Sequence, residues 1–344
     1  MSSSGPEERT PRPAPGTPES ARGGHRPGER KARGPRTVVA LGGNAMTAPD
    51  GHARPEDQRA AIESAMEHVA DLIAAGTEVV LTHGNGPQVG NLLVKNELAA
   101  RVVPPVPLDW CGAQTQATIG FTMVSALEAA LRRRGHERAV AALVTRTRVD
   151  ADDPAFANPS KPVGRYLPPA EAEEFIALGQ DWIDLGPRGM RRVVASPEPR
   201  EILDAPALLT LIESGAVPVA AGGGGIPVVC DDRGTVRGAE AVLDKDRTAA
   251  LLARAVGAKR LVIATDVPAA IVGYGTDDAR PIGRIRAAEL RAYADQGHFA
   301  DGSMGPKVEA ALRFVESGGE RAVITGLDRM GAGLDGREGT VVEP

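Results

Sequence analysis

The sequence is poor in cysteine and in aromatic residues. Its 344 residues include two cysteines, Cys111 and Cys230, and 3% are aromatic. The cysteines lie far apart and form no Cys-x-x-Cys or Cys/His pattern, so neither a disulfide framework nor a zinc site is expected. We interpret both as small apolar core residues. The histidines show no metal-ligand spacing either, and we predict no metal ion held by the protein alone.

Long apolar runs and an excess of basic charge are also absent. The longest apolar stretch, residues 216–230, is interrupted by prolines and glycines, so it predicts a strand and a glycine loop rather than a membrane-spanning helix. Lysine and arginine number 40 against 45 aspartates and glutamates, for a formal net charge of −5. This balance disfavours binding to nucleic acid or anionic lipid. We therefore expect a cytoplasmic protein with no nucleic-acid or membrane partner.

The first 36 residues differ in composition from the rest of the chain. They are rich in Pro, Gly, Ser, Arg and Glu and contain few apolar residues, so they cannot bury enough surface to order their backbone. They also lack the apolar region of a secretory signal. We predict a disordered extension over residues 1–36 and a folded domain over residues 37–344.

Short β-branched runs alternate with longer helical segments from residue 37 onward. This alternation predicts an α/β fold with a mostly parallel sheet covered by helices on both faces. The predicted strands are 37–41, 77–82, 139–144, 217–221, 261–265 and 321–325, and the predicted helices are 56–75, 87–101, 113–134, 246–256 and 305–317. Residues 149–199 interrupt the pattern with many prolines, and we interpret them as an inserted lid with a short helix near 169–178.

Glycine-rich turns follow several of the predicted strands. They are Gly42-Gly43-Asn44, Gly84-Asn85-Gly86 and Gly222 to Gly225, and Asp266 follows the strand that ends at Thr265. Ligands of open parallel sheets bind beyond the carboxyl ends of the strands, and glycine lets backbone N–H groups approach a phosphate closely. These turns predict a phosphate-binding edge of the sheet. His83, beside one of them, is interpreted as a structural hydrogen-bonding residue.

Two lysines at predicted helix starts add positive charge near these turns. Lys307 follows the turn Gly302-Ser303-Met304-Gly305, but the spacing and Val308 exclude a P-loop. Lys245 lies between Asp244 and Asp246. Acids at a helix start are often only caps, yet phosphoryl transfer needs rigidly held cations, and a carboxylate can hold ammonium groups in place. Both interpretations of the acidic residues remain open at this point.

These segments together resemble the carbamate kinases, which belong to the amino-acid kinase family, over nearly all of residues 36–344. The segments that carry the resemblance are Ala40 to Ala45, Thr82 to Gly90, Ser160 to Gly164, Arg191 to Pro197, Gly222 to Val228, Glu240 to Asp246 and Gly302 to Ala310. The resemblance implies a three-layer αβα sandwich around a mainly parallel eight-stranded sheet with a small inserted lid, in a homodimer. It further implies a lobe over residues 37–225 for the acceptor and the phosphate, with the lid at about 149–199, and a lobe over residues 226–344 for the nucleotide.

The resemblance also implies the reaction and the residues that carry it. The expected reaction is reversible phosphoryl transfer between ATP and carbamate, with Mg²⁺ accompanying the nucleotide, in the direction of ATP formation during breakdown of arginine or related nitrogen compounds. The expected residues are Lys245, Asp246 and Lys307 for catalysis; Gly42, Gly43, Asn44, Gly84, Asn85, Gly86 and Lys161 for the acceptor; and Gly223, Gly224, Thr265, Asp266, Met304 and Lys307 for the nucleotide.

One segment departs from the family pattern, and two other functions remain possible. After Gly164 the family continues with Pro-Phe-Tyr, whereas this chain has Arg165-Tyr166-Leu167, which affects the expected closure of the lid. One alternative is another amino-acid kinase that acts on a different small carboxylate, such as acetylglutamate. The other is a non-catalytic sensor of nucleotide or carbamoyl phosphate, against which the presence of Lys245, Asp246 and Lys307 argues.

Overall fold

The β-branched runs form one sheet of eight strands in a computed structural model that describes residues 34–43, 54–300 and 303–344. The strand order is β15-β17-β16-β12-β1-β2-β9-β3. All six predicted strands belong to it: β1 (Arg36–Leu41), β2 (Glu78–His83), β3 (Val140–Ala142), β9 (Val217–Val219), β12 (Arg260–Thr265) and β16 (Arg321–Gly326). Neighbouring strands run parallel except β16 and β17 (Thr340–Glu343). The predicted extension up to residue 33 and the predicted site residue Asn44 lie outside the described residues.

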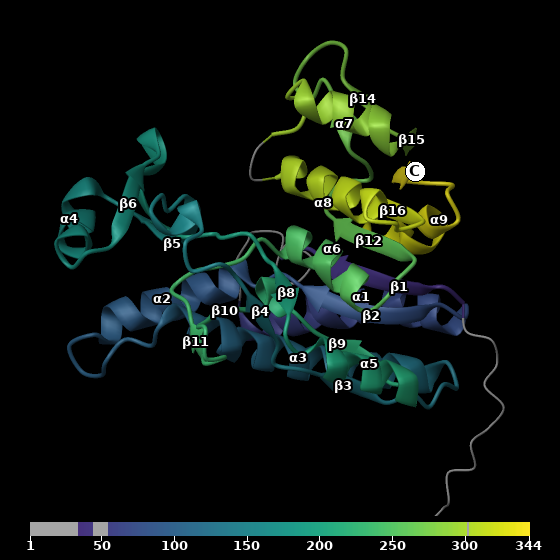
Figure 1. Cartoon of the computed structure of the whole chain (residues 1–344), viewed down its shortest axis with the longest axis horizontal. Coiled ribbons are helices and arrows are strands. Elements are labelled where there is room, and N and C mark those ends of the chain that lie inside the picture. Colours follow the sequence, from purple (N-terminus) through teal and green to yellow (C-terminus); the bar gives the residue numbers. More distant parts are fainter. Residues whose placement is uncertain (1–33, 44–53, 301–302) are drawn as a thin grey trace, which may run out of the picture. The chain divides into compact units, whose positions relative to one another are not determined.

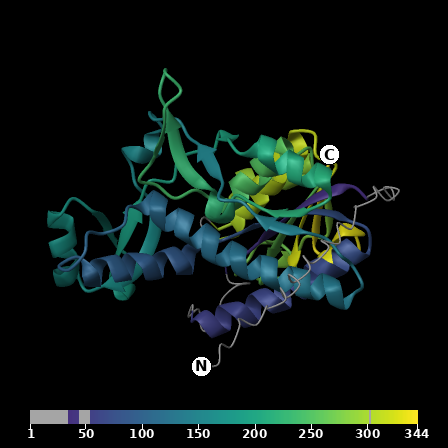
Figure 2. The same cartoon turned by 90° about the horizontal axis from the view of Figure 1, so that it is seen from below.

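Helices cover both faces of this sheet (Figures 1 and 2). Alternate residues of β1 point to opposite sides, so that Val39 packs in one core and Val38 in the other. The first core is closed by α1 (Pro55–Ala74), α3 (Leu108–Arg133) and α9 (Met330–Leu334), and the second by α5 (Ala205–Ser214), α6 (Lys245–Ala255), α7 (Ala287–Asp295) and α8 (Met304–Glu316). The predicted three-layer αβα sandwich is therefore confirmed.

The helix boundaries follow from local sequence signals. Helix α1 has Pro55 as its first residue and Glu56 and Asp57 in its first turn, where their negative charges stabilise the helix N-terminus. Its buried residues recur at helical spacing, at positions 62, 65, 66, 69, 70, 72 and 73. Helix α3 begins at Leu108, five residues before its predicted start, because Pro107 is its N-cap and Leu108 is already buried.

Two of the three smaller sheets in the described residues have three or more strands. One has the order β11-β10-β4-β8, from β4 (Arg146–Arg148), β8 (Glu201–Ile202), β10 (Ile226–Cys230) and β11 (Val236–Gly238). The other, which we call the small sheet, has the order β5-β7-β6, from β5 (Lys161–Leu167), β6 (Asp181–Asp184) and β7 (Met190–Val194). It carries α4 (Pro169–Ala177), and its strand β5 lies against α2 (Gly86–Ala99) (Figure 1).

The two cysteines have different environments. Cys111 is buried, as predicted, but Cys230 is exposed, so the prediction for Cys230 is wrong. Cys230 is the last residue of β10, in the four-stranded sheet rather than in either core of the main sheet. None of the helices in the described ranges is long and apolar enough to cross a membrane.

Candidate active site

A buried carboxylate holds two lysine ammonium groups at the carboxyl edge of the main sheet. Asp246 is 3% exposed, and its Oδ1 accepts a hydrogen bond from Lys245 Nζ at 2.6 Å while its Oδ2 accepts one from Lys307 Nζ at 3.2 Å. Lys245 is the first residue of α6, and Lys307 lies in the first turn of α8. One carboxylate thus fixes two cations beside two helix N-termini, an arrangement that favours a bound anion.

Asp244 has two separate partners at the start of α6. Its Oδ1 accepts the backbone N–H groups of Asp246 at 3.0 Å and Arg247 at 3.2 Å, so Asp244 is the N-cap. Its Oδ2 accepts a hydrogen bond from Lys161 Nζ of the small sheet at 3.0 Å. Burial would raise the pKa of Asp244, but the Lys161 ammonium and the helix amides outweigh burial and hold it below its ordinary value. The carboxylate is therefore charged at neutral pH and attracts Lys161.

The turns after β1 and β2 pack tightly against Lys245. A Cβ atom on Gly84 would lie 3.0 Å from Gly43 N and 3.1 Å from Lys245 Cδ, so only glycine fits without displacement. The N–H groups of Gly42 and Gly84 donate to the carbonyls of Ala264 and Leu41, both at 3.0 Å. These two amides complete the sheet and are not available to an anion.

The four glycines 222–225 approach four different side chains. Added Cβ atoms would lie 2.3 Å from His83 Nε2, 2.1 Å from Asn85 Nδ2, 2.6 Å from Leu243 Cβ and 2.0 Å from Thr147 Oγ1, in the order of the chain. All four distances are far below van der Waals contact. The run therefore leaves room for these four side chains, among them Asn85, whose Nδ2 also donates to Thr115 Oγ1 at 2.9 Å.

Two cavities meet at the lysine cluster. The first has a volume of about 760 Å³ and is lined by the predicted acceptor residues Gly84, Asn85, Gly86 and Lys161. The second has a volume of about 610 Å³ and is lined by the predicted nucleotide residues Thr265, Asp266 and Met304. Both cavities are lined by Gly43, Lys245, Ser303 and Lys307. Two ligands in these cavities would share the two ammonium groups between them.

Three predicted residues lie elsewhere than expected from their assigned ligand. Gly42, assigned to the acceptor, lines the second cavity. Gly223, assigned to the nucleotide, lines the first cavity. Gly224 is buried against Leu243 and lines neither of the two cavities described here. Of the glycine run, Gly223 thus borders the first cavity and not the second.

Aromatic residues that the sequence reasoning missed line the second cavity. Tyr274 is 78% exposed on the turn between β13 (Ile271–Val272) and β14 (Arg280–Pro281), and Phe299 lies across the same cavity. Flat aromatic faces next to apolar side chains suit a planar heterocycle. The signal in the sequence was a lone tyrosine between glycines, Gly273-Tyr274-Gly275.

His83 is a neutral structural residue behind the first cavity. It is buried, and its Nδ1 donates to the carbonyl of Gly84 at 2.9 Å. Burial above all, with help from the Lys245 ammonium, lowers the pKa of His83 to about 4. The imidazole therefore stays uncharged at neutral pH and adds no further positive charge to the lysine cluster.

This low pKa predicts a loss of stability in mild acid. As the pH falls from about 6.5 to about 4, His83 takes up a proton in the unfolded chain but not in the folded one, so the free energy of unfolding should fall by about 3 kcal/mol on this account. Urea unfolding of the wild type and of His83→Asn at pH 7.5 and pH 4.5 measures this contribution. The variant should lose less stability than the wild type over this interval, and equal losses would contradict the assignment.

The described residues contain no group of three or more His, Cys, Asp or Glu side chains that could hold a metal ion. Asp246, the most buried carboxylate of the site, is fully engaged by its two lysines. This donor set fits a magnesium ion bound mainly through ligand phosphates, which is common for Mg²⁺ with nucleotides.

Comparison with known proteins gives consistent matches along the chain. A model described as the Amino acid kinase family matches residues 35–326. Carbamate kinase of Thermococcus kodakarensis is 46% identical over 312 residues, which cover 89% of this chain and 98% of that protein. Carbamate kinase of Pyrococcus furiosus is 44% identical over a match that covers 90% of this chain and 100% of that protein. The structure of Giardia lamblia carbamate kinase bound to AMP-PNP has a TM-score of 0.85 at 38% identity and covers 90% of this chain and 98% of that one.

Proposed function

Since the chain belongs to the amino acid kinase family, we propose that it is a carbamate kinase, which transfers a phosphoryl group reversibly between ATP and carbamate. The observation that carries the proposal is the cluster of Lys245, Asp246 and Lys307 at the boundary of two cavities. Relatives that are carbamate kinases match this chain over nearly their whole length. We propose that the reaction runs in the direction of ATP formation, because carbamoyl phosphate is a reactive phosphoryl donor. We also propose a cytoplasmic location.

The two lysines would stabilise the phosphoryl group during transfer. In the direction of carbamoyl phosphate synthesis, a carbamate oxygen forms a bond to the γ-phosphorus while the bond to the β,γ-bridging oxygen breaks and leaves its electron pair on ADP. The transition state is loose and its charge spreads over the three equatorial oxygens. Lys245 and Lys307 would face these oxygens from the wall common to both cavities. Asp246 would hold the two lysine side chains in place. No side-chain base is required, because the carbamate oxygen is already anionic.

The second cavity would hold the nucleotide. Thr265, Asp266 and Met304 lie at the ends of β12 and the start of α8, and Tyr274 and Phe299 offer apolar faces for the base. The Giardia lamblia relative was solved with AMP-PNP, a nucleotide analogue. Magnesium bound to the phosphates would neutralise part of their charge.

The first cavity would hold the acceptor. Carbamate has four heavy atoms, whereas the cavity has a volume of about 760 Å³, so the site must become smaller around its ligand. The small sheet carries Lys161 into this cavity, and we propose that it acts as the lid, within residues 149–199. We also propose that residues 37–225 serve the acceptor and residues 226–344 the nucleotide, although Asp244 to Asp246 of the second part line the acceptor cavity.

Two exposed aromatic residues of α3 support the proposal of a homodimer. Trp110 and Phe121 are 62% and 68% exposed, and their separation of eleven residues places them on one side of the helix. Exposed aromatic residues on one helix face mark an interaction surface. Light scattering of the purified protein would measure the mass of the assembly directly.

Formation of ATP from ADP and carbamoyl phosphate is the expected activity. A coupled assay with hexokinase and glucose-6-phosphate dehydrogenase, with Mg²⁺ present throughout, should report ATP only when both substrates are present. Acetylglutamate with ATP should give no turnover, because a first cavity that closes around the four heavy atoms of carbamate would leave no room for this larger acceptor. Turnover with acetylglutamate alone would favour another amino-acid kinase, and binding of ADP without any turnover would favour a sensor.

A further inference from the structure

The small sheet is joined to the rest of the chain by two connecting segments, residues 149–160 and 195–200. In the pairing of β5 with β7, Lys161 lies opposite Val194, so both segments begin at the end of the sheet that carries Lys161. Glu198 lies four residues beyond Val194, on the second segment. The position of Lys161 therefore depends on how this base of the small sheet is held.

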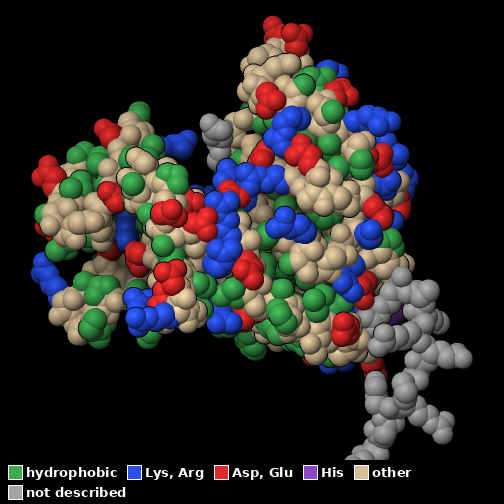
Figure 3. Space-filling view, in the orientation of Figure 1, with side chains coloured by type: hydrophobic (Ala, Val, Ile, Leu, Met, Phe, Trp, Pro, Cys, Tyr) green, Lys and Arg blue, Asp and Glu red, His purple; other side chains and the backbone are tan. Residues whose placement is uncertain are grey.

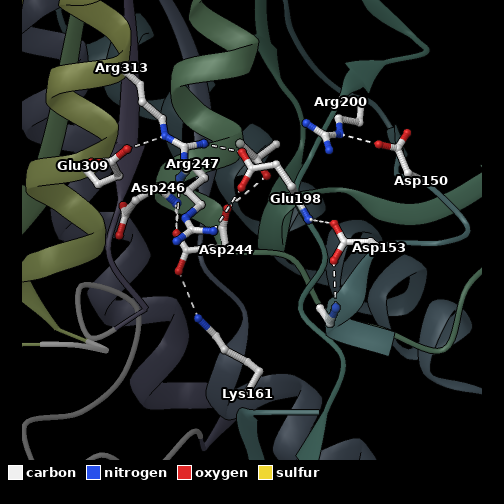
Figure 4. A network of polar contacts seen from close by, with 12 residues as sticks. Asp150, Asp153, Lys161, Glu198, Arg200, Asp244, Asp246, Arg247, Glu309 and Arg313 are labelled. Atoms are coloured by element: carbon white, nitrogen blue, oxygen red, sulfur yellow. Dashed lines mark hydrogen bonds and ion pairs between the residues drawn. The ribbon is translucent and has the colours of Figure 1, made fainter. Parts of the chain in front are cut away.

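Glu198 binds two arginines of two different helices (Figure 4). Its Oε2 accepts a hydrogen bond from Arg247 Nη1 at 3.0 Å, and its Oε1 accepts one from Arg313 Nη1. Arg247 lies two residues after Lys245 in α6, and Arg313 lies in α8, the helix of Lys307. The Glu198 side chain is 24% exposed. One carboxylate thus ties the base of the small sheet to both helices that carry the site lysines.

The backbone of Glu198 joins the other connecting segment. Its N–H donates to Asp153 Oδ2 at 2.9 Å, while Asp153 Oδ1 accepts the N–H of Ala155 at 2.9 Å. Asp153 and Glu198 therefore hold the two segments together at the point where both leave the body of the protein (Figure 4). Through this bond, the side chain of Glu198 connects both segments to α6 and α8.

One of the two arginines, Arg313, is itself held in place by a second carboxylate. Arg313 Nε donates to Glu309 Oε1 at 2.6 Å, and Glu309 also pairs with Arg291 at 2.6 Å. Burial would lower the pKa of Arg313, but its bonds to Glu309 and Glu198 outweigh burial and raise it. Figure 3 shows basic and acidic side chains intermingled on the face that carries α6 and β8. Ion pairs in such networks are stronger than isolated surface pairs.

We propose that Glu198 is a positioning residue for the acceptor site: it fixes the base of the small sheet to α6 and α8, so that Lys161 stays beside Asp244 and Lys245. The proposal rests on the proposed function, in which Lys161 meets the acceptor. Glu198 lines neither cavity of the candidate site, so its effect on the site is indirect, and we assign that effect to Lys161 rather than to the lysines of α6 and α8. Removing it should weaken the acceptor site and leave the nucleotide site intact.

Glu198→Gln should raise the KM for carbamoyl phosphate about 10-fold and lower kcat several-fold, with the Kd for ADP within about 2-fold of wild type. The matched control is Glu316→Gln, which removes a carboxylate of α8 that pairs with Arg291 rather than with the base of the small sheet. The control should keep wild-type KM, kcat and Kd. An unchanged KM in Glu198→Gln, or a weaker Kd for ADP, would overturn the proposal.

A double-mutant cycle separates positioning of Lys161 from general stabilisation. In a Lys161→Ala background, Glu198→Gln should cause no further rise in the KM for carbamoyl phosphate, because the group that Glu198 positions is already absent. Equal effects in both backgrounds would mean that Glu198 acts through the fold as a whole, and the proposal would fail.

Hydrogen exchange of the free protein tests, without an activity assay, whether the ion pairs of Glu198 with Arg247 and Arg313 hold the base of the small sheet; we call these two ion pairs the clamp. Glu198→Gln should speed amide exchange in residues 149–167 and 190–200 but not in the cores of α6 and α8, and Glu316→Gln should speed neither. Unchanged exchange in the two segments would refute the clamp. If the clamp is present by exchange but the wild type makes no ATP from carbamoyl phosphate, the proposed function fails and the structural role of Glu198 stands.

Discussion

Replacing Lys245 with methionine is expected to lower kcat by about 10²-fold or more, and Lys307→Met should do the same. Methionine keeps most of the length and packing of the lysine stem but removes the fixed ammonium group. Each ammonium lies at the wall shared by the two cavities, where the phosphoryl group would pass. Because the charge that develops during transfer is on that group, the loss should appear mainly in kcat rather than in KM.

Steady-state kinetics of the purified variants, with circular dichroism to confirm folding, measure this effect. Lys259→Met is the matched control, since Lys259 pairs with Glu320 at 3.4 Å on the surface and lines neither of the two cavities. The control should keep wild-type kcat. A folded Lys245→Met protein with wild-type turnover would show that another residue stabilises the transferred group.

Asp246→Asn should also lower kcat by about 10²-fold, without weakening the binding of ADP. The carboxylate accepts from Lys245 through one oxygen and from Lys307 through the other. An asparagine amide can accept from only one of them, and its NH₂ group would face the other ammonium. One lysine therefore loses its fixed position, while the total positive charge beside the nucleotide increases.

The same substitution should destabilise the free protein. Removing the charge of a buried carboxylate leaves two neighbouring ammonium groups uncompensated, at a cost of about 3 kcal/mol, and bound ADP should restore part of the loss. Calorimetric titration with ADP and thermal unfolding with and without ADP test these statements. The exposed Asp335→Asn, which removes the partner of Arg337 at 2.7 Å, is the control. A large loss of ADP affinity in Asp246→Asn would contradict the proposed role of Asp246.

The main sheet could be predicted from the sequence where its strands are long and apolar. Strands β1, β2, β12 and β16 are six-residue runs that are almost wholly buried, so their composition reflects helices on both faces. Strand β15 (Arg284–Arg286) was missed because only Ile285 of its three residues is buried. A single apolar residue forms no alternating pattern of apolar and polar residues from which a strand could be predicted. Strand β17, which lies next to β15 in the sheet, was also missed. It is recognised as a strand by its pairing with β15 and β16, which the local sequence does not show.

The candidate site could be predicted at its turns but not in its cross-connections. Lys245, Asp246 and Lys307 stand at helix starts, Lys245 and Asp246 directly after the N-cap Asp244 and Lys307 after a glycine turn, and these are local signals. The pair of Lys161 with Asp244 joins residues 83 positions apart, and the pair of Glu198 with Arg313 joins residues 115 positions apart. No local spacing specifies such contacts, because they depend on how the small sheet packs against α6 and α8.

The glycine run 222–225 has a consequence for the gene as well as for the protein. Every missense change in a glycine codon adds at least a Cβ atom, and at each of these four positions that atom would lie within 2.6 Å of another side chain. The relevant neighbours are four different residues from three separate parts of the chain, so no single second substitution could relieve more than one of the clashes. Among random variants of this sequence, the twelve nucleotides that encode the run should therefore accept silent changes almost exclusively.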